Sequence, residues 1–292
     1  MLLHYAVLRK IFAHPGQRPG TMVSGLRAVP FWHPRLPAAA AGLPPGLEFV
    51  RVLERPESVA TFRRELLGLR DGEAGLNGDV PGNVGAGCGT DAAADDVVAA
   101  VAAGRPQNEG IHEGGAWSEH DLIREGRPVS GAQANFPASM AILRAASAAL
   151  DGDGDVDGAH WAFINARIST VQPGTHITPH CGVTNARLRA HLGLSVPTGG
   201  GRAGGVFKSG LRVDTGIQSW EVGKVVVFDD SFEHEVWWQV GAGADTAAVG
   251  GGGGGGPRVV LIVDIFHPDL SPAQKAFYRN QMSDIANNNN NC

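Results

Sequence analysis

The sequence is poor in cysteine, in long apolar runs and, over residues 1–47, in acidic side chains. Its three cysteines, Cys88, Cys181 and Cys292, form an odd set without framework spacing, so we expect no dependence on disulfides. No apolar run approaches the ~20 residues of a membrane-spanning helix, which predicts a chain without a transmembrane span. A net charge of -5 argues against a general nucleic-acid binder, because such proteins need a basic surface.

The acid-free start of the chain contains several basic residues. Residues 1–27 carry Arg9, Lys10, Arg18 and Arg27. This composition is typical of an organelle transit peptide and equally of a flexible basic arm, and residues 1–8 also resemble a poor secretory signal. The sequence therefore predicts a soluble protein and leaves an organellar and a cytoplasmic location both open.

The remainder of the 292-residue chain has the composition of a globular protein. Hydrophobic residues make up 43% of it, which supports a sizeable core. We expect one domain over residues 28–280, interrupted by low-complexity inserts at 71–104 and 241–256. An asparagine-rich tail at 281–292 is expected to be disordered.

Hydrophobic spacing predicts helices first and strands afterwards. Residues 56–69 and 136–150 have helical periodicity, with a proline near each start, and 94–103 suggest a further short helix. Segments rich in Val, Ile, Phe and Trp then predict strands over 161–171, 187–196, 205–214, 224–229, 235–240 and 258–266. This order indicates a mainly β fold, an antiparallel sandwich or jelly roll with flanking N-terminal helices.

The acidic segment 151–158 resembles the start of a calcium-binding loop. Val156 stands where the sharp turn needs glycine, and Ala162 stands where a bidentate glutamate belongs. We therefore interpret this segment as a solvated loop.

Two histidines, His180 and His234, lie in segments that suit a metal site. His176 and His180 are four residues apart on an extended segment and would share a face, with His176 as a structural or supporting residue. Cys181 would point to the opposite face from His180, which makes it a weaker candidate ligand. Spacing alone leaves the assignment of these histidines open.

A cationic face is predicted over residues 187–192. Alternation along a strand places Arg187, Arg189 and His191 on one face, which then requires water or an anion. Arg258 opens the apolar strand 258–266 and offers bidentate pairing to a carboxylate. Pairing with an acidic side chain at the rim is the alternative for Arg258.

Three long runs, 173–194, 220–237 and 258–274, resemble the aspartyl/asparaginyl beta-hydroxylase family of Fe(II)- and 2-oxoglutarate-dependent dioxygenases. Weaker similarity extends to 115–118, 135–143 and 31–34. The resemblance implies a double-stranded beta-helix (jelly roll) and hydroxylation of the β carbon of an aspartyl or asparaginyl residue in a peptide or protein. It implies Fe(II), 2-oxoglutarate and O2 as cofactor and co-substrates.

The resemblance also assigns roles to individual residues. It implies metal ligands at His180 and His234, 2-oxoglutarate contacts at Ser169, Arg189, His191 and Arg258, and substrate contacts at Trp117, Arg167 and Arg187. The third position of the usual facial triad is Gly182, which cannot coordinate, and the resemblance implies water there. Asp229 or Asp230 is the alternative third ligand.

Some parts of the chain depart from the family pattern. The two inserts are not part of it, and 108–119 match poorly outside Trp117 and Ser118, so peptide specificity has less support than the iron chemistry. The same chemistry on a free amino acid, another small carboxylate or a lipid acyl chain is the first alternative. A non-catalytic jelly-roll protein that binds a metal or ligand is the alternative from another class.

Overall fold

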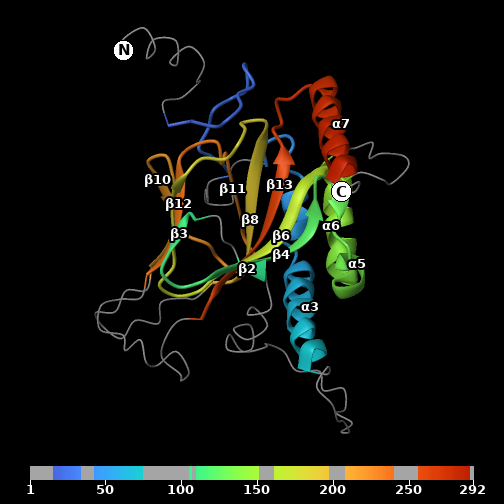
Figure 1. Cartoon of the computed structure of the whole chain (residues 1–292), viewed down its shortest axis with the longest axis vertical. Coiled ribbons are helices and arrows are strands. Elements are labelled where there is room, and N and C mark those ends of the chain that lie inside the picture. The colour runs from blue at the N-terminus through green and yellow to red at the C-terminus, as the bar shows by residue number, and fades with distance from the viewer. Residues whose placement is uncertain are drawn as a thin grey trace.

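The computed structural model describes residues 16–33, 43–74, 105–106, 110–150, 161–196, 208–239 and 256–289. Within these ranges most strands belong to two antiparallel sheets that face each other (Figure 1). Apolar side chains from both sheets, such as Val260 and Ile262 of one and Val236 and Trp238 of the other, form a shared core. This arrangement is the jelly roll that the sequence predicts.

The larger sheet has eight strands. Their order is β1-β11-β8-β13-β6-β4-β2, with β5 paired to β4. Their bounds are β1 (Phe31–His33), β2 (Arg105–Pro106), β4 (Trp117–Arg124), β5 (Arg127–Pro128), β6 (Phe163–Val171), β8 (Arg187–Ser195), β11 (Val225–Phe228) and β13 (Arg258–Phe266). Strand β13 lies at the centre between β6 and β8 and is buried along its whole length.

The smaller sheet has five strands in the order β10-β9-β12-β7-β3. Their bounds are β3 (His112–Glu113), β7 (His176–His180), β9 (Lys208–Val213), β10 (Gly216–Gln218) and β12 (His234–Gln239). The two sheets together form the double-stranded beta-helix.

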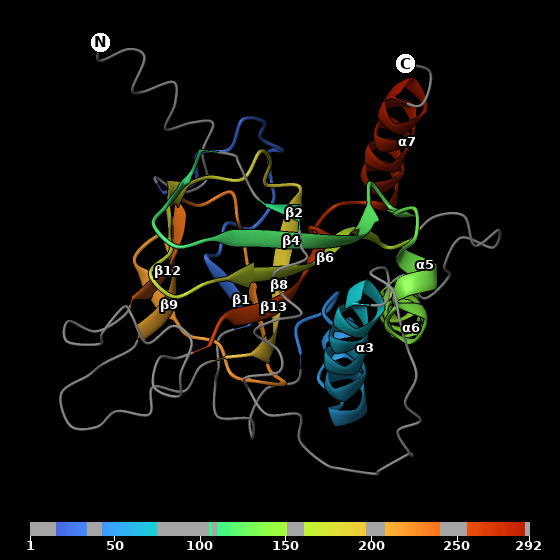
Figure 2. The same cartoon turned by 60° about the horizontal axis from the view of Figure 1, so that its bottom comes forward.

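Helices cover the face of the larger sheet that points away from the smaller one (Figures 1 and 2). They are α2 (Phe49–Leu53), α3 (Pro56–Ala74), α5 (Ala132–Asn135) and α6 (Pro137–Leu150). The last helix, α7 (Pro272–Asn289), follows β13 and projects away from the sheet (Figure 2). Phe62 of α3 and Leu143 of α6 belong to the same buried cluster as Leu188 of β8. The carboxylate of Glu65 on α3 accepts the backbone N–H groups of Ala138 and Ser139, both at 2.7 Å, and so caps α6.

The strongest sequence patterns are confirmed. The two expected long helices are α3 and α6, and the six expected strands are β6, β8, β9, β11, β12 and β13. Strands β4 and β7 were not predicted, because charged, histidine and proline side chains interrupt their apolar alternation. Pairing with neighbouring strands stabilises them instead.

The N-terminal boundary expected at residue 28 is wrong. Gln17 and Leu26 are buried against the domain, and an isolated bridge pairs Gln17 with Phe232. The domain therefore already includes Gly16, and 16–27 are not a detached arm. Residues 1–15 lie outside the described residues.

The C-terminal expectation needs a similar correction, because α7 continues to Asn289 inside the tail predicted to be disordered. Its first turn has a reciprocal capping box: Ser271 N donates to Gln274 Oε1 and Gln274 N donates to Ser271 Oγ. Once nucleated, a helix extends at little further cost.

The low-complexity regions are only partly described. Helix α3 extends to Ala74, inside the first expected insert, and β2 starts directly after that insert. The rest of that insert lies outside the described residues, and so does the helix expected at 94–103. The same holds for the acidic segment 151–158 and for residues 241–255. No helix in the described ranges is long and apolar enough to cross a membrane.

Candidate functional site

A cavity of about 310 Å³ lies between the two sheets. It is lined by all nine residues that the family resemblance names as metal, co-substrate or substrate contacts: Trp117, Arg167, Ser169, His180, Arg187, Arg189, His191, His234 and Arg258. The predicted alternation along β8 is confirmed, because its cationic side chains line this cavity while Leu188 and Ala190 pack beneath the helices.

His180 ends β7 and His234 begins β12, and the two residues are direct cross-strand partners. Their rings lie 4.2 Å apart between centroids. The next register pair is Ile177 with Val236, so β7 uses three residues where β12 uses two, which is a β-bulge. The bulge places both Ile177 and His180 at the cavity.

The expectation that His176 shares a face with His180 is therefore wrong. The extra residue in β7 reverses the alternation, and His176 does not line the cavity. Its Nε2 instead lies 2.7 Å from Oε2 of Glu235, whose neighbour His234 faces the cavity. His176 pairs with a partly buried carboxylate on the far side of the smaller sheet.

Both cavity histidines have a defined tautomer. The Nδ1 of His180 lies 2.7 Å from the carbonyl of Thr178, and that of His234 lies 2.9 Å from the carbonyl of Phe232. A carbonyl can only accept, so each Nδ1 carries the proton and each Nε2 has the lone pair that a metal requires. Burial, and then the neighbouring His180, lower the pKa of His234 to about 3. His234 therefore stays uncharged at neutral pH, and the two Nε2 lone pairs suit a divalent metal.

Gly182 lies against the carboxylate of Asp230. A Cβ at Gly182 would come within 2.6 Å of that carboxyl group, and Gly182 N donates to the Asp230 carbonyl at 2.6 Å. The position that carries a carboxylate ligand in the usual facial triad therefore has no room for a side chain here.

No further side chain in the described part of the chain completes a three-ligand set. Among the described residues, no group of three His, Cys, Asp or Glu side chains is arranged to hold a metal. Asp229 accepts hydrogen bonds from Ser231 and Gln17, and Asp230 accepts them from Arg187. Cys181 lines the cavity, and burial raises the pKa of its thiol. The donor set supplied by the described chain is thus the histidine pair.

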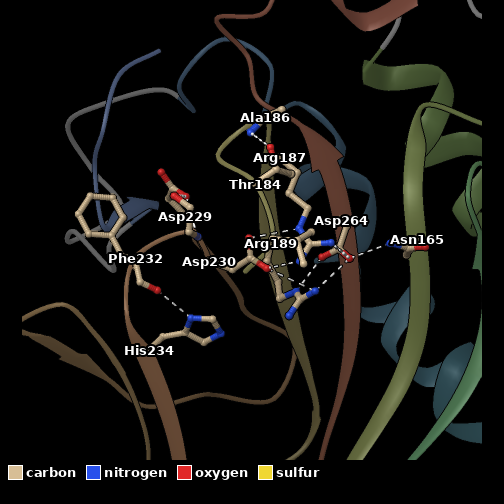
Figure 3. Close-up of polar contacts among 12 residues, drawn as sticks. Asn165, Thr184, Ala186, Arg187, Arg189, Asp229, Asp230, Phe232, His234 and Asp264 are labelled. Atoms are coloured by element: carbon tan, nitrogen blue, oxygen red, sulfur yellow. Dashed lines mark hydrogen bonds and ion pairs between the residues drawn. The ribbon is translucent and has the colours of Figure 1, made fainter. Parts of the chain in front are cut away.

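Two buried aspartates neutralise the cationic face (Figure 3). Arg187 Nη2 lies 2.6 Å from Asp230 Oδ2, and Arg189 Nε lies 2.7 Å from Asp264 Oδ1. Asn165 Nδ2 also donates to Asp264, at 3.0 Å. Burial opposes these charges, but the aspartates raise the pKa of Arg187 and Arg189, and the arginines hold that of Asp264 far below its usual range. The anions that the sequence requires next to Arg187 and Arg189 are therefore supplied in part by the protein's own Asp230 and Asp264.

Arg258 and His191 differ from those pairs. Arg258 is 2% exposed, and its guanidinium stacks over Trp220 with its central carbon 4.6 Å from the ring centre. Trp220 Nε1 donates to His191 Nδ1 at 3.2 Å, so the proton of His191 is on Nε2. Neither His191 Nε2 nor Arg258 Nη1 has a hydrogen-bond partner among the described residues. Burial lowers the pKa of Arg258 to about 9, which leaves the guanidinium charged at neutral pH.

Strand β4 contributes two further cavity residues. Trp117 Nε1 donates to Ser169 Oγ at 3.0 Å, so this tryptophan, predicted as a substrate contact, also fixes the Ser169 hydroxyl. Glu119 is 4% exposed, and its Oε1 lies 3.5 Å from Arg167 Nε.

Sequence reasoning missed Glu119, Trp220 and Asp264. Asp264 carried a usable signal, because it lies six residues after Arg258 and so on the same face of the last long strand. Glu119 and Trp220 carried none, since no strand was predicted around either residue.

The geometry agrees with the similarity of this chain to known proteins. Residues 93–268 match the sequence profile of a family described as aspartyl/asparaginyl beta-hydroxylase. The aspartyl/asparaginyl beta-hydroxylase of Mus musculus is 32% identical over 264 residues, covering 90% of this chain and 27% of the relative. That of Homo sapiens is 31% identical over 264 residues, covering 90% of this chain and 26% of the relative.

The chain spans about a quarter of the length of these curated relatives. Among solved structures, a 2OG-Fe(II) oxygenase family oxidoreductase from Burkholderia pseudomallei overlaps with a TM-score of 0.36 and 16% identity, over 56% of this chain and 73% of that one. This overlap is too low to support an argument, and the sequence matches decide the assignment. The chain belongs to the aspartyl/asparaginyl beta-hydroxylase family.

Proposed function

We propose that this chain is an Fe(II)- and 2-oxoglutarate-dependent dioxygenase that hydroxylates the β carbon of an aspartyl or asparaginyl residue in a peptide or protein. The observation that carries the proposal is a pair of buried donors at one cavity, His191 Nε2 and Arg258 Nη1, for which the described part of the chain offers no acceptor. Buried donors without partners are costly, so the cavity is built for an anionic ligand that supplies acceptors.

His180 and His234 would hold the metal through Nε2. Backbone carbonyls keep the proton of each ring on Nδ1, and burial keeps His234 uncharged. Imidazole suits Fe(II) among other first-row metals. The small residue Gly182 leaves the remaining metal positions to water and co-substrate.

Arg258 would bind one carboxylate of 2-oxoglutarate, with His191 and Ser169 as further contacts. The Trp220 ring holds the guanidinium in place, and Trp117 holds the Ser169 hydroxyl. Arg189 would contribute through the field of its charge, since Asp264 already accepts its Nε and Nη2 hydrogen bonds. When bound, Fe(II) and 2-oxoglutarate supply the chemistry that activates O2 and inserts one oxygen atom into a C–H bond.

The charge balance of the cavity favours a substrate with a carboxylate. Four arginines line the cavity, and three buried carboxylates, Glu119, Asp230 and Asp264, accompany them, which leaves one net positive charge. Fe(II) and 2-oxoglutarate carry equal and opposite charges, so that excess remains for the substrate. An aspartyl side chain uses it, whereas an uncharged acyl chain does not.

Arg167 is the arginine best placed to meet that carboxylate. Its ion-pair partners Glu119 and Asp264 are both 3.5 Å away, whereas the shortest contacts of Arg187 and Arg189 are 2.6 and 2.7 Å. The Arg167 side chain is also 22% exposed. Arg187 would assist from β8 while Asp230 keeps it oriented. Trp117 would form part of the wall next to the substrate.

The test is direct hydroxylation by the purified chain. We expect Fe(II), ascorbate and 2-oxoglutarate to yield succinate and a mass gain of one oxygen atom on an Asp-containing peptide. His180→Ala and His234→Ala should abolish both products. His176→Ala is the matched control, because this histidine of the same strand lies outside the cavity, and its product yield should persist.

A substrate panel separates the alternatives. Free aspartate, another small carboxylate and an acylated lipid are tested beside the Asp peptide and its Asn counterpart. Oxidation of only a small carboxylate or a lipid would contradict the peptide assignment while keeping the chemistry. Tight metal binding without an oxidised product from any substrate would refute the enzyme and favour a binding protein.

A further inference from the structure

An N-terminal strap, residues 16–23, lies across the two loops next to the metal-binding histidines. One loop, 229–233, immediately precedes His234, and the other, 181–185, immediately follows His180. The strap is far from both loops in sequence, yet isolated bridges join Gln17 to Phe232 and Thr21 to Thr184.

The first crossing of the strap fixes the loop before His234. Glu233 N donates to the Gly16 carbonyl and Arg18 N donates to the Ser231 carbonyl, both at 2.9 Å. Between them the Gln17 side chain is 1% exposed, and its Nε2 donates to Asp229 Oδ2 at 3.0 Å and to Ser231 Oγ at 2.8 Å. A buried amide that bonds the loop at two points limits its movement.

The second crossing fixes the loop after His180. Thr21 N donates to the Val183 carbonyl at 2.9 Å. The amide of Asn185, which is 2% exposed, holds both backbone groups of Val23: Val23 N donates to its Oδ1 at 2.7 Å, and its Nδ2 donates to the Val23 carbonyl at 2.9 Å.

These crossings connect directly to the histidines. The carbonyl of Phe232 accepts the Nδ1 proton of His234, and the backbone of Phe232 is bridged to Gln17. The two loops also touch each other where Gly182 N donates to the Asp230 carbonyl at 2.6 Å. A shift of the strap would therefore change the orientation of His234 and the spacing of the two loops.

We propose that residues 16–23 set the geometry of the two-histidine metal site. Gln17 is the positioning residue at the first crossing, and Asn185, which holds Val23, is the positioning residue at the second. The inference rests on the proposed function, since it treats His180 and His234 as metal ligands. Residues 16–23 do not line the cavity. The strap holds the two loops that carry the ligands, in the manner of the outer contacts that orient ligating side chains elsewhere.

The test compares metal affinity in the full chain and its Gln17→Ala and Asn185→Ala variants. Mn(II) dissociation constants are measured by electron paramagnetic resonance, and the visible spectrum of bound Co(II) reports ligand geometry. Loss of contacts outside the ligands lowers metal affinity on the order of tenfold or more, and we expect a weakening of this size with an altered Co(II) spectrum. Glu65→Ala is the stability control, because it removes the cap of α6 on the opposite side of the larger sheet.

The outcomes separate the strap from the proposed function. Weakened binding in Gln17→Ala and Asn185→Ala but not in Glu65→Ala supports the strap. Wild-type affinity and spectrum in both strap variants would overturn it while leaving the proposed function intact. Equal weakening in Glu65→Ala would also overturn it, since global destabilisation would then explain the loss. Absence of Mn(II) and Co(II) binding in the wild type would refute the metal site and the strap together.

Discussion

Replacing Arg258 by methionine should weaken 2-oxoglutarate binding far more than it changes the stability of the ligand-free protein. Arg258 is buried with Nη1 unpartnered, so its charge is desolvated without a compensating hydrogen bond. An unsatisfied buried donor costs about 1–3 kcal/mol, and methionine removes this cost. The substitution also loses the stacking on Trp220, worth about 0.5–2 kcal/mol. The two effects have opposite signs, so the ligand-free variant should lie between about 1 kcal/mol below and about 2.5 kcal/mol above the wild type in stability.

The loss of affinity should be much larger than the change in stability. Truncating one side of a buried charge pair costs about 2–5 kcal/mol of binding, so 2-oxoglutarate should bind at least ~30-fold more weakly. At a concentration of about 100 times the wild-type dissociation constant, the ligand should stabilise the wild type by about 2.7 kcal/mol. A variant with 100-fold weaker binding would gain only about 0.4 kcal/mol under the same conditions.

Thermal unfolding with and without 2-oxoglutarate measures both quantities. For a protein of this size 1 kcal/mol shifts the midpoint by about 2–4 °C, so the wild type should gain about 5–10 °C and the variant about 1–2 °C. Arg144→Met is the matched control, because Arg144 stacks over Trp161 in the same way but does not line the cavity. A ligand-induced shift of wild-type size in Arg258→Met would refute the assignment of Arg258.

Three further predictions follow from buried or capping carboxylates. Glu65→Ala should lower the unfolding free energy by about 1 kcal/mol in urea denaturation, because α6 loses its cap. The 2-oxoglutarate affinity should stay unchanged, and a lower affinity in this variant would contradict the prediction. Burial raises the pKa of Asp229 from 3.8 to about 7, so the folded state binds this proton more tightly than the unfolded chain and stability is lost as pH rises between those values. The unfolding free energy of the wild type minus that of Asp229→Asn should therefore fall as the pH rises from 3.8 to about 7. A difference that does not change with pH would contradict this prediction. Asp264→Asn should cost about 3–5 kcal/mol, because Arg189 loses its 2.7 Å partner and keeps, among the described residues, only a 3.5 Å contact to Asp230. Arg189→Met in the same chain should recover part of this loss in a double-mutant cycle.

Local sequence patterns predicted which side chains face the cavity better than they predicted the ion pairs between those side chains. Alternation along 187–192 was sufficient to place Arg187, Arg189 and His191 on one face, and periodicity located most long elements. Asp264 could have been found by the same alternation from Arg258. The ion pair between Asp264 and Arg189 could not have been predicted in this way, because it depends on which strands become neighbours in the sheet.

The contribution of the N-terminal residues was hidden for a different reason. Gln17 and Asp229 are 212 positions apart, and nothing in the composition around Gln17 distinguishes a buried strap from a basic arm. The bulge in β7 was equally hidden, because strict alternation assigned His176 and His180 to the same face. Register and long-range contacts are properties of the assembled sheets, and a single sequence specifies them only through the fold.

The β-bulge of β7 makes the site sensitive to the length of the chain as well as to the identity of its residues. Because β7 has one extra residue between Ile177 and His180, His180 faces the cavity whereas His176 faces away from it. Deleting a single residue there would restore regular alternation and turn one of these side chains to the opposite face. An insertion or deletion of one codon in this short segment would therefore change which side chains face the cavity without changing any histidine.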